Sequence, residues 1–116
     1  MFAHCSSLTT APELPATTLA EGCYSEMFED CSSLTTAPEL PALTLEKECY
    51  YQMFIDCTSL NYVKAKFTTN IPYNKATHRW LENVSSTGSF YKNVNATWDL
   101  SGESGVPQGW SIYLIT

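Results

Sequence analysis

Apolar residues in the first half of the chain recur in short groups that fit one face of a helix. In the stretch CYSEMFEDC, positions i, i+1, i+4, i+5 and i+8 hold Cys23, Tyr24, Met27, Phe28 and Cys31. The stretch CYYQMFIDC, residues 49–57, repeats the same pattern. Nine residues are too few for a stable isolated helix in water. The pattern therefore predicts two short helices whose apolar faces are buried against neighbouring segments.

Short strands are expected after these helices. The run SLTTA occurs twice, at residues 7–11 and 33–37. Each copy is followed by a proline, Pro12 or Pro38, which cannot donate a hydrogen bond to a β-ladder. At the corresponding place after residues 49–57 the prolines are absent, and LNYVKAKF, residues 60–67, predicts a longer strand. The residues expected to point inward are Leu60, Val63, Ala65 and Phe67.

These elements belong to a repeat of 26 residues. Residues 5–16 and 31–42 are identical, and the same period aligns Met1 with Met27 and Met53. A fixed period between about 20 and 50 residues indicates a solenoid, and 26 lies within the leucine-rich range. The predicted fold is therefore an α/β solenoid, with short parallel strands on one face and short helices on the other.

The last third of the chain contains a different set of predicted elements. In YNKATHRWLENV an inward helical face is formed by Ala76, Trp80, Leu81 and Val84. GSFYKN and WSIYLI then read as two strands separated by a loop rich in Gly and Ser. The three tryptophans of this region predict a large apolar plug over the last repeat, with a carbohydrate-stacking platform as the alternative.

The repeat resembles a known family. The order MFxxC[ST]SL, followed in two copies by TTAPELPA, is similar to the BspA-like leucine-rich repeat proteins found on the surface of gut Bacteroidetes. The resemblance covers residues 1–67 closely, and the GVPQGW segment within residues 68–116 is similar to the end of many such proteins. It implies a right-handed leucine-rich solenoid with a C-terminal capping segment in the same domain. It also implies export, and adhesion or host recognition without a catalytic centre.

The N-terminal repeat is incomplete, because Met1 occupies the mid-helix position of Met27 and Met53. A solenoid end without a cap exposes its stacking face. Two expectations follow: either further repeats precede Met1 in the native product, or a homodimer forms through the N-terminal edge. The chain has no signal peptide and no apolar run long enough to span a membrane. The expected location is therefore the cell surface or the exterior if a longer precursor exists.

Charge is unevenly distributed along the chain. The net charge is −6, but residues 1–60 hold nine of the twelve acidic residues against one basic residue and carry −8. Residues 61–116 hold three acidic and five basic residues and carry +2. Binding to a phosphate backbone needs clustered Lys and Arg. The acidic first half therefore argues against a nucleic-acid partner.

The cysteines and histidines do not indicate an enzyme. The repeat sets the cysteine spacing, so Cys5, Cys31 and Cys57 are expected to form one buried column, with Cys23 and Cys49 forming another. His4 aligns with Asp30 and Asp56 at a solvent-side position, and His78 is expected on the surface. No CxxC, GxSxG, HExxH or P-loop motif occurs. No catalytic residue, resident metal or cofactor is predicted; a thiol- or metal-dependent enzyme is the weakest alternative.

Two columns of like charge are formed by Glu13 over Glu39 and by Asp30 over Asp56. A calcium-bridged ladder is conceivable there, because Ca²⁺ takes several oxygen ligands. Without a DxDxDG-type loop, solvated surface carboxylates are the preferred interpretation. Glu21 falls over Lys47, which predicts an opposite-charge pair.

The outward face of the predicted sheet is the candidate binding surface. If Val63 and Ala65 point inward, the alternate side chains of the strand point outward. The repeat then adds two threonines from the earlier copies, so that the candidate binding residues are Thr10, Thr36, Tyr62, Lys64 and Lys66. The expected ligand is a protein or glycan at a surface.

Overall fold

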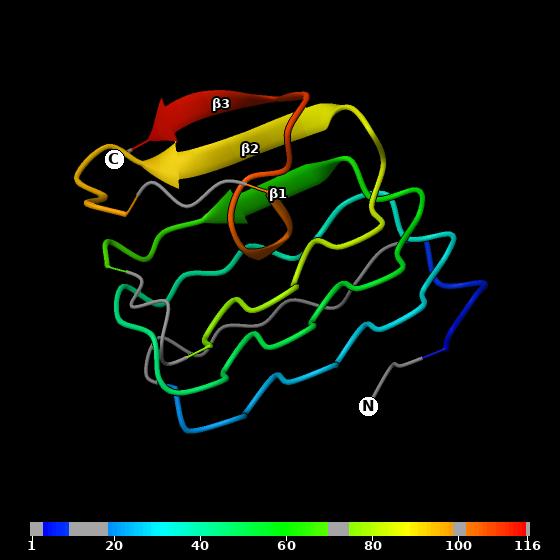
Figure 1. Ribbon diagram of the computed structural model, residues 1–116, viewed down its shortest axis with the longest axis horizontal. Helices are drawn as coiled ribbons and strands as arrows, with labels where there is room; N and C mark the ends of the chain where they lie inside the picture. The colour runs from blue at the N-terminus through cyan, green and yellow to red at the C-terminus, as the bar shows by residue number, and fades with distance from the viewer. Residues whose placement is uncertain (1–3, 10–18, 70–74, 99–101, 116) are drawn as a thin grey trace.

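The computed structural model describes residues 4–9, 19–69, 75–98 and 102–115. Three strands form one parallel sheet: β1 (Tyr62–Ala65), β2 (Gly88–Asn93) and β3 (Trp110–Ile115), in the order β1-β2-β3. A short 3-10 helix, η2 (Gly102–Ser104), lies between β2 and β3 in the chain. Wavy segments without regular secondary structure form a second layer that faces the sheet (Figure 1).

Three of the predicted strands are confirmed as β1, β2 and β3, although β1 is shorter than the stretch that predicted it. The prediction of a short strand at residues 33–37 is wrong, and the one at residues 7–11 lies partly outside the described residues. Val63, Ala65 and Phe90 are fully buried on the inner face of the sheet, and the alternate residues of β1 are half-buried on the outer face. Before β1, an isolated parallel bridge joins Leu40 to Ala65. No strand forms in residues 31–42, where Pro38 has no N–H to donate.

The predicted helices are wrong: no α-helix occurs anywhere in the described residues. Residues 22–31, 48–57 and 75–84 instead form three extended chains of successive turns, called here the first, second and third turn segments. Within a segment, every second N–H donates to the carbonyl three residues earlier, as Met27 does to Tyr24. In the first two segments the remaining N–H groups donate to the next segment; Phe28 donates to the Met53 oxygen at 2.9 Å. An α-helix would satisfy its N–H groups internally.

The backbone explains why the helical prediction failed. In each turn segment every fourth residue has a positive φ, including Glu26 (56°), Gln52 (49°) and Arg79 (53°). The two residues that follow Glu26, Gln52 and Arg79 are buried, and the same holds after Glu48 and Lys75, so the apolar pattern has a period of four residues. Over nine residues, a period of four cannot be told from the 3.6-residue period of a helix.

One column of left-handed residues crosses all the turn layers and consists of His4, Asp30, Asp56 and Asn83, with φ between 57° and 64°. Asp, Asn and His tolerate this conformation better than most residues. Their side chains also make contacts along the column: His4 Nδ1 lies 3.3 Å from Asp30 Oδ2, and Asn83 Nδ2 donates to Asp56 Oδ1 at 2.8 Å. The backbone conformation therefore accounts for the acidic column Asp30–Asp56.

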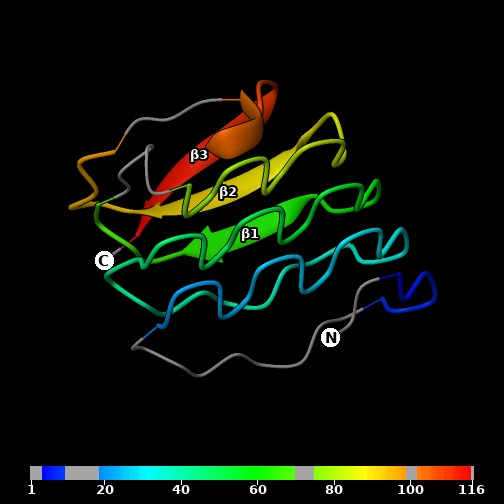
Figure 2. The same cartoon turned by 60° about the horizontal axis from the view of Figure 1, so that its bottom comes forward.

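The core lies between the sheet and the turn segments. Figure 2 shows how these two layers of backbone face each other. Stacked rings run from one turn segment to the next; Phe28 and Phe54 lie 5.5 Å apart and nearly parallel. Tyr50 stacks on Trp80 at 5.9 Å, and Phe67, which follows β1, contacts both. This contiguous cluster extends from Leu19 to Trp110.

The residues around η2 lie against the third turn segment. Ser104 Oγ accepts a hydrogen bond from the backbone N–H of Arg79, and the Thr77 hydroxyl donates to the Ser104 carbonyl at 2.7 Å. The indole N–H of Trp80 donates to the Gly105 carbonyl at 3.0 Å. Side chains of the last turn segment are thereby hydrogen-bonded to a piece of chain about 25 residues further on.

Candidate binding face

A row of three tyrosines crosses the outer face of the sheet, one from each strand. Tyr62 and Tyr91 have their ring centroids 5.1 Å apart, and Tyr91 and Tyr113 are also 5.1 Å apart, with an angle of 23° between the latter rings. Tyr91 pairs directly with Tyr113 in the β-ladder, whereas Tyr62 lies diagonally across from Tyr91. We call these three residues the tyrosine row. Its rings pack against one another, so a ligand would meet mainly ring edges.

Two lysines lie beside the tyrosine row, one on β1 and one just after it. Lys64 is the register partner of Tyr91 and is half-buried. Lys66 follows the strand, and its ammonium lies 3.0 Å from the Glu39 carboxylate. This hydrogen bond lowers the pKa of Glu39. Because both side chains of that pair are substantially exposed, the pair contributes little to stability.

The structure brings together most of the binding residues predicted from the sequence. Tyr62, Lys64 and Lys66 all lie on the outer face of the sheet, as expected. Thr36 is exposed beside them, since the adjacent Ala37 N–H donates to the Tyr62 carbonyl at 3.0 Å. Thr10 lies outside the described residues.

Tyr91 and Tyr113 were not among the predicted binding residues. A signal for both was present in the sequence, because each tyrosine follows an inward-facing residue in its predicted strand. What the sequence did not reveal was the register, which places Tyr91 beside Tyr113. With a side-chain period of two, a shift of one residue would have sent either ring to the core.

All three tryptophans are buried, which favours the plug over the carbohydrate platform. Trp80, Trp98 and Trp110 are at most 7% exposed. The indole N–H of Trp98 donates to the Phe67 carbonyl at 3.2 Å, and that of Trp110 donates to the Ser85 carbonyl at 2.8 Å. Their ring faces are therefore not offered to a sugar.

The cysteine columns are only partly as predicted. Cys31, Cys49 and Cys57 are fully buried, whereas Cys5 and Cys23, the first member of each column, are exposed. All five are free thiols. Burial raises the pKa of Cys49 to about 11 and that of Cys57 to about 12. Thiols held protonated in this way are poor nucleophiles.

The described charged side chains of the surface can be compared with the positions that the repeat predicted for them. The Lys47 ammonium lies 3.8 Å from the Glu21 carboxylate, which confirms the predicted opposite-charge pair. Glu13, the first member of the other acidic column, lies outside the described residues. His4 is exposed as expected, and the half-buried His78 ring stacks on Tyr51 at 5.5 Å. In the described part of the chain, no three His, Cys, Asp or Glu side chains gather around a common point that could hold a metal ion.

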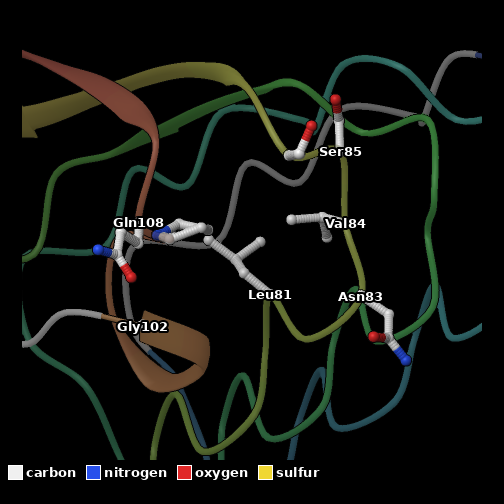
Figure 3. Close-up of a pocket in the computed structure, with 8 residues that line it drawn as sticks. Leu81, Asn83, Val84, Ser85, Gly102 and Gln108 are labelled. Atoms are coloured by element: carbon white, nitrogen blue, oxygen red, sulfur yellow. The ribbon is translucent and has the colours of Figure 1, made fainter.

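A shallow hollow of about 260 Å³ lies between the third turn segment and the loop before β3 (Figure 3). Leu81, Val84 and Pro107 supply its apolar part. Its polar part comes from Asn83, Ser85, Ser86 and Gln108. The side chains described around it include no titratable group, and its volume is below the roughly 300 Å³ at which ligand pockets begin. We therefore place the candidate site on the sheet face.

No protein-family model, curated protein or solved structure matches the chain. Among the described residues, no helix has the length and apolar character needed to cross a membrane.

Proposed function

We propose that this protein is a non-enzymatic binding protein of a cell surface that recognises a protein or glycan through the outer face of its sheet. The observation that carries the proposal is the tyrosine row flanked by Lys64. Tyrosine is enriched in recognition surfaces because it offers a large rigid ring and a polar end at low entropic cost. A lysine beside it adds a charge that can orient the ligand.

The proposal includes the BspA-like leucine-rich solenoid as the scaffold. Support comes from the sequence repeat and from the hydrogen bonds between turn segments, which join residues about one repeat apart, such as Phe28 to Met53 and Phe54 to Trp80. The parallel order of the strands is also consistent with stacked repeats. A solenoid presents its sheet face as an extended surface, and such a surface suits adhesion. A surface or exported location is part of the same proposal.

The test uses the purified chain on a printed array of animal glycans and on immobilised collagen, fibronectin and laminin. For any probe that binds, Tyr91→Ala should weaken binding at least about 10-fold, as expected for an aromatic residue at the centre of an interface. As a separate variant, Lys64→Glu should weaken binding even more and should reduce the salt dependence of binding.

Two matched variants control for unrelated effects. Tyr51→Ala removes a half-buried tyrosine from the turn layer, and Lys75→Glu reverses an exposed charge on that same layer. Both should bind like the unaltered chain. If a probe binds the Tyr91→Ala and Lys64→Glu variants unchanged, the sheet face is not the binding surface.

A second candidate function is assembly through the N-terminal edge. It is favoured by the exposure of Cys23, whose counterpart Cys49 is fully buried one repeat later. All described hydrogen bonds between turn segments run from the earlier segment to the carbonyl groups of the later one. A partner at this edge must therefore supply N–H groups. Cys23→Glu should abolish such an assembly, as measured by sedimentation.

A further inference from the structure

The outer edge of β3 is open. β3 pairs along its whole length with β2, from Trp110 to Ile115, and no described residue pairs with its other side. Three consecutive large side chains on this strand are about half exposed or more: Ile112 (51%), Tyr113 (48%) and Leu114 (63%). Few other large apolar residues in the described chain are so exposed.

On both faces of the sheet, the side chains at this edge are left uncovered by the described chain. The register places Ile112 beside Phe90, which is fully buried, so Ile112 and Leu114 lie on the core side of the sheet. Tyr113 lies on the opposite side and ends the tyrosine row. The apolar layer and the tyrosine row thus both reach the edge without a covering group from the described chain.

The strand also lacks the features that protect natural edges. Sheet edges are usually blocked by Lys, by Pro, by a bulge or by an inward-pointing charge. Residues 108–115, QGWSIYLI, contain no charged residue and no proline. β3 pairs with β2 residue for residue over six consecutive positions, without a bulge.

We propose that β3 pairs in an antiparallel manner with β3 of a second copy of this chain, about a two-fold axis at Tyr113. This register places Ile112 opposite Leu114 of the second copy, and Tyr113 opposite its own counterpart. A two-fold interface requires a surface that complements itself. The sequence Ile-Tyr-Leu meets this requirement, because the apolar residues meet below the sheet and the tyrosines meet above it.

The second copy is favoured over an unrelated strand by continuity with the existing sheet. Two three-stranded sheets become one six-stranded sheet, and the two tyrosine rows become one row across the dimer. Because cross-strand aromatic and aliphatic pairs are the main stabilising contacts of a sheet, both sets of contacts favour this register. The dimer does not depend on the proposed binding function, although it would double the binding face.

The first experiment is sedimentation equilibrium over a wide range of protein concentration. The unaltered chain should be a reversible dimer. Leu114→Lys should raise the dissociation constant at least about 100-fold, since each dimer loses two buried leucines and gains two charges. Leu43→Lys, which replaces an apolar residue of similar exposure (55%), should leave the dimer unchanged.

The fold of each variant is checked by tryptophan fluorescence and is expected to be unchanged, because both leucines are mostly exposed. A chain that is monomeric at every concentration would overturn the proposal. So would a dimer that survives Leu114→Lys, and so would one weakened equally by Leu43→Lys.

A second experiment tests the register. In a background with Cys5→Ser and Cys23→Ser, Tyr113→Cys should form a disulfide with its own counterpart when oxidised glutathione is added, since directly opposed Cβ atoms lie about 5 Å apart. Ser111→Cys is the control and should remain reduced, because the two copies of residue 111 lie at opposite ends of the paired strands. Equal cross-linking of both variants would rule out the two-fold at Tyr113.

Discussion

In one column of this protein the residue types match the backbone conformation, although Glu26, Gln52 and Arg79 adopt a left-handed conformation elsewhere. The column His4, Asp30, Asp56 and Asn83 first reads as a row of surface charges, but all four residues have a positive φ. Left-handed backbone costs an ordinary L-residue roughly 1–2 kcal/mol, and Asp, Asn and Gly are the residues that adopt it most readily. The side chains in this column are thus those that the turns require.

A substitution at Asp56 tests this interpretation. Asp56→Val should lower the free energy of unfolding by about 1–2 kcal/mol, because a β-branched residue is strained at a φ of 64°. Asp56→Asn should be nearly neutral, since Asn tolerates the conformation and keeps an oxygen that can accept the hydrogen bond from Asn83. Urea denaturation of the three proteins measures the difference. Equal losses for Val and Asn would show that charge matters here and conformation does not.

The buried thiols predict how stability changes with pH. Cys57 donates to the Phe28 carbonyl at 2.9 Å, and burial raises its pKa to about 12. In the unfolded chain the thiol ionises near pH 8.5. Stability is therefore complete below about pH 8.5 and falls as the pH rises toward 12, by up to about 1.4 kcal/mol per unit for each such thiol.

Cys57→Ala should make this alkaline loss shallower, as measured by urea denaturation between pH 8 and 11. Cys5→Ala, at an exposed thiol, is the control and should leave the slope unchanged. The same slope for Cys57→Ala as for the unaltered chain would contradict the assignment.

At the level of elements, the turn segments and the strands depend on the same feature, which is hydrogen bonding to a neighbour one repeat away. Phe28, Phe54 and Asp56 donate to the following segment just as the strands bond to the next strand. These hydrogen bonds require neighbouring stretches of backbone to lie close together. At the start of β2, Gly88 lies between the Asn61 carbonyl and the Trp110 ring, and a Cβ there would lie 2.7 Å from both.

Gly88→Ala should therefore destabilise the fold by about 1–3 kcal/mol, the usual cost of forcing extra volume into a packed site. Ser89→Ala is the matched control at the next position and should change stability by less than about 0.5 kcal/mol. Thermal or urea unfolding measures both. A neutral Gly88→Ala variant would mean that β1, β2 and Trp110 are not packed together as described.

Across the part of the molecule that the structure describes, one apolar cluster connects the sheet to the turn layer. Phe67 is central to it, with its ring 5.0 Å from Trp98 and 5.9 Å from Trp80. The cluster extends from Leu19 to Trp110, so the repeats and the C-terminal region share one core. Cooperative unfolding is expected of such a core.

Phe67→Ala should cost about 3–5 kcal/mol, as truncation of a buried phenylalanine usually does. Because the core is shared, tryptophan fluorescence and far-UV circular dichroism should report the same lowered midpoint. Leu43→Ala, at an exposed position, should leave the midpoint nearly unchanged. Separate transitions for the two signals would indicate that the repeats and the C-terminal region unfold independently.

The sequence by itself determined most of the buried residues and the positions of the three strands. Val63, Ala65 and Phe67 follow from the alternation of apolar positions, and Phe28, Met53 and Trp80 follow from the groups that recur in the turn segments. Burial is a property of apolar periodicity, and the 26-residue repeat shows that the same environment recurs along the chain.

Only the tertiary structure decided what backbone carries those buried groups. A period of four and a period of 3.6 agree over nine residues, and the choice between them depends on whether N–H groups bond within a segment or to the next one. The exposure of Cys5 and Cys23 likewise depends on what packs beside them. The tyrosine row required the register of three strands, because Tyr62, Tyr91 and Tyr113 are far apart in the chain and meet only when the sheet forms.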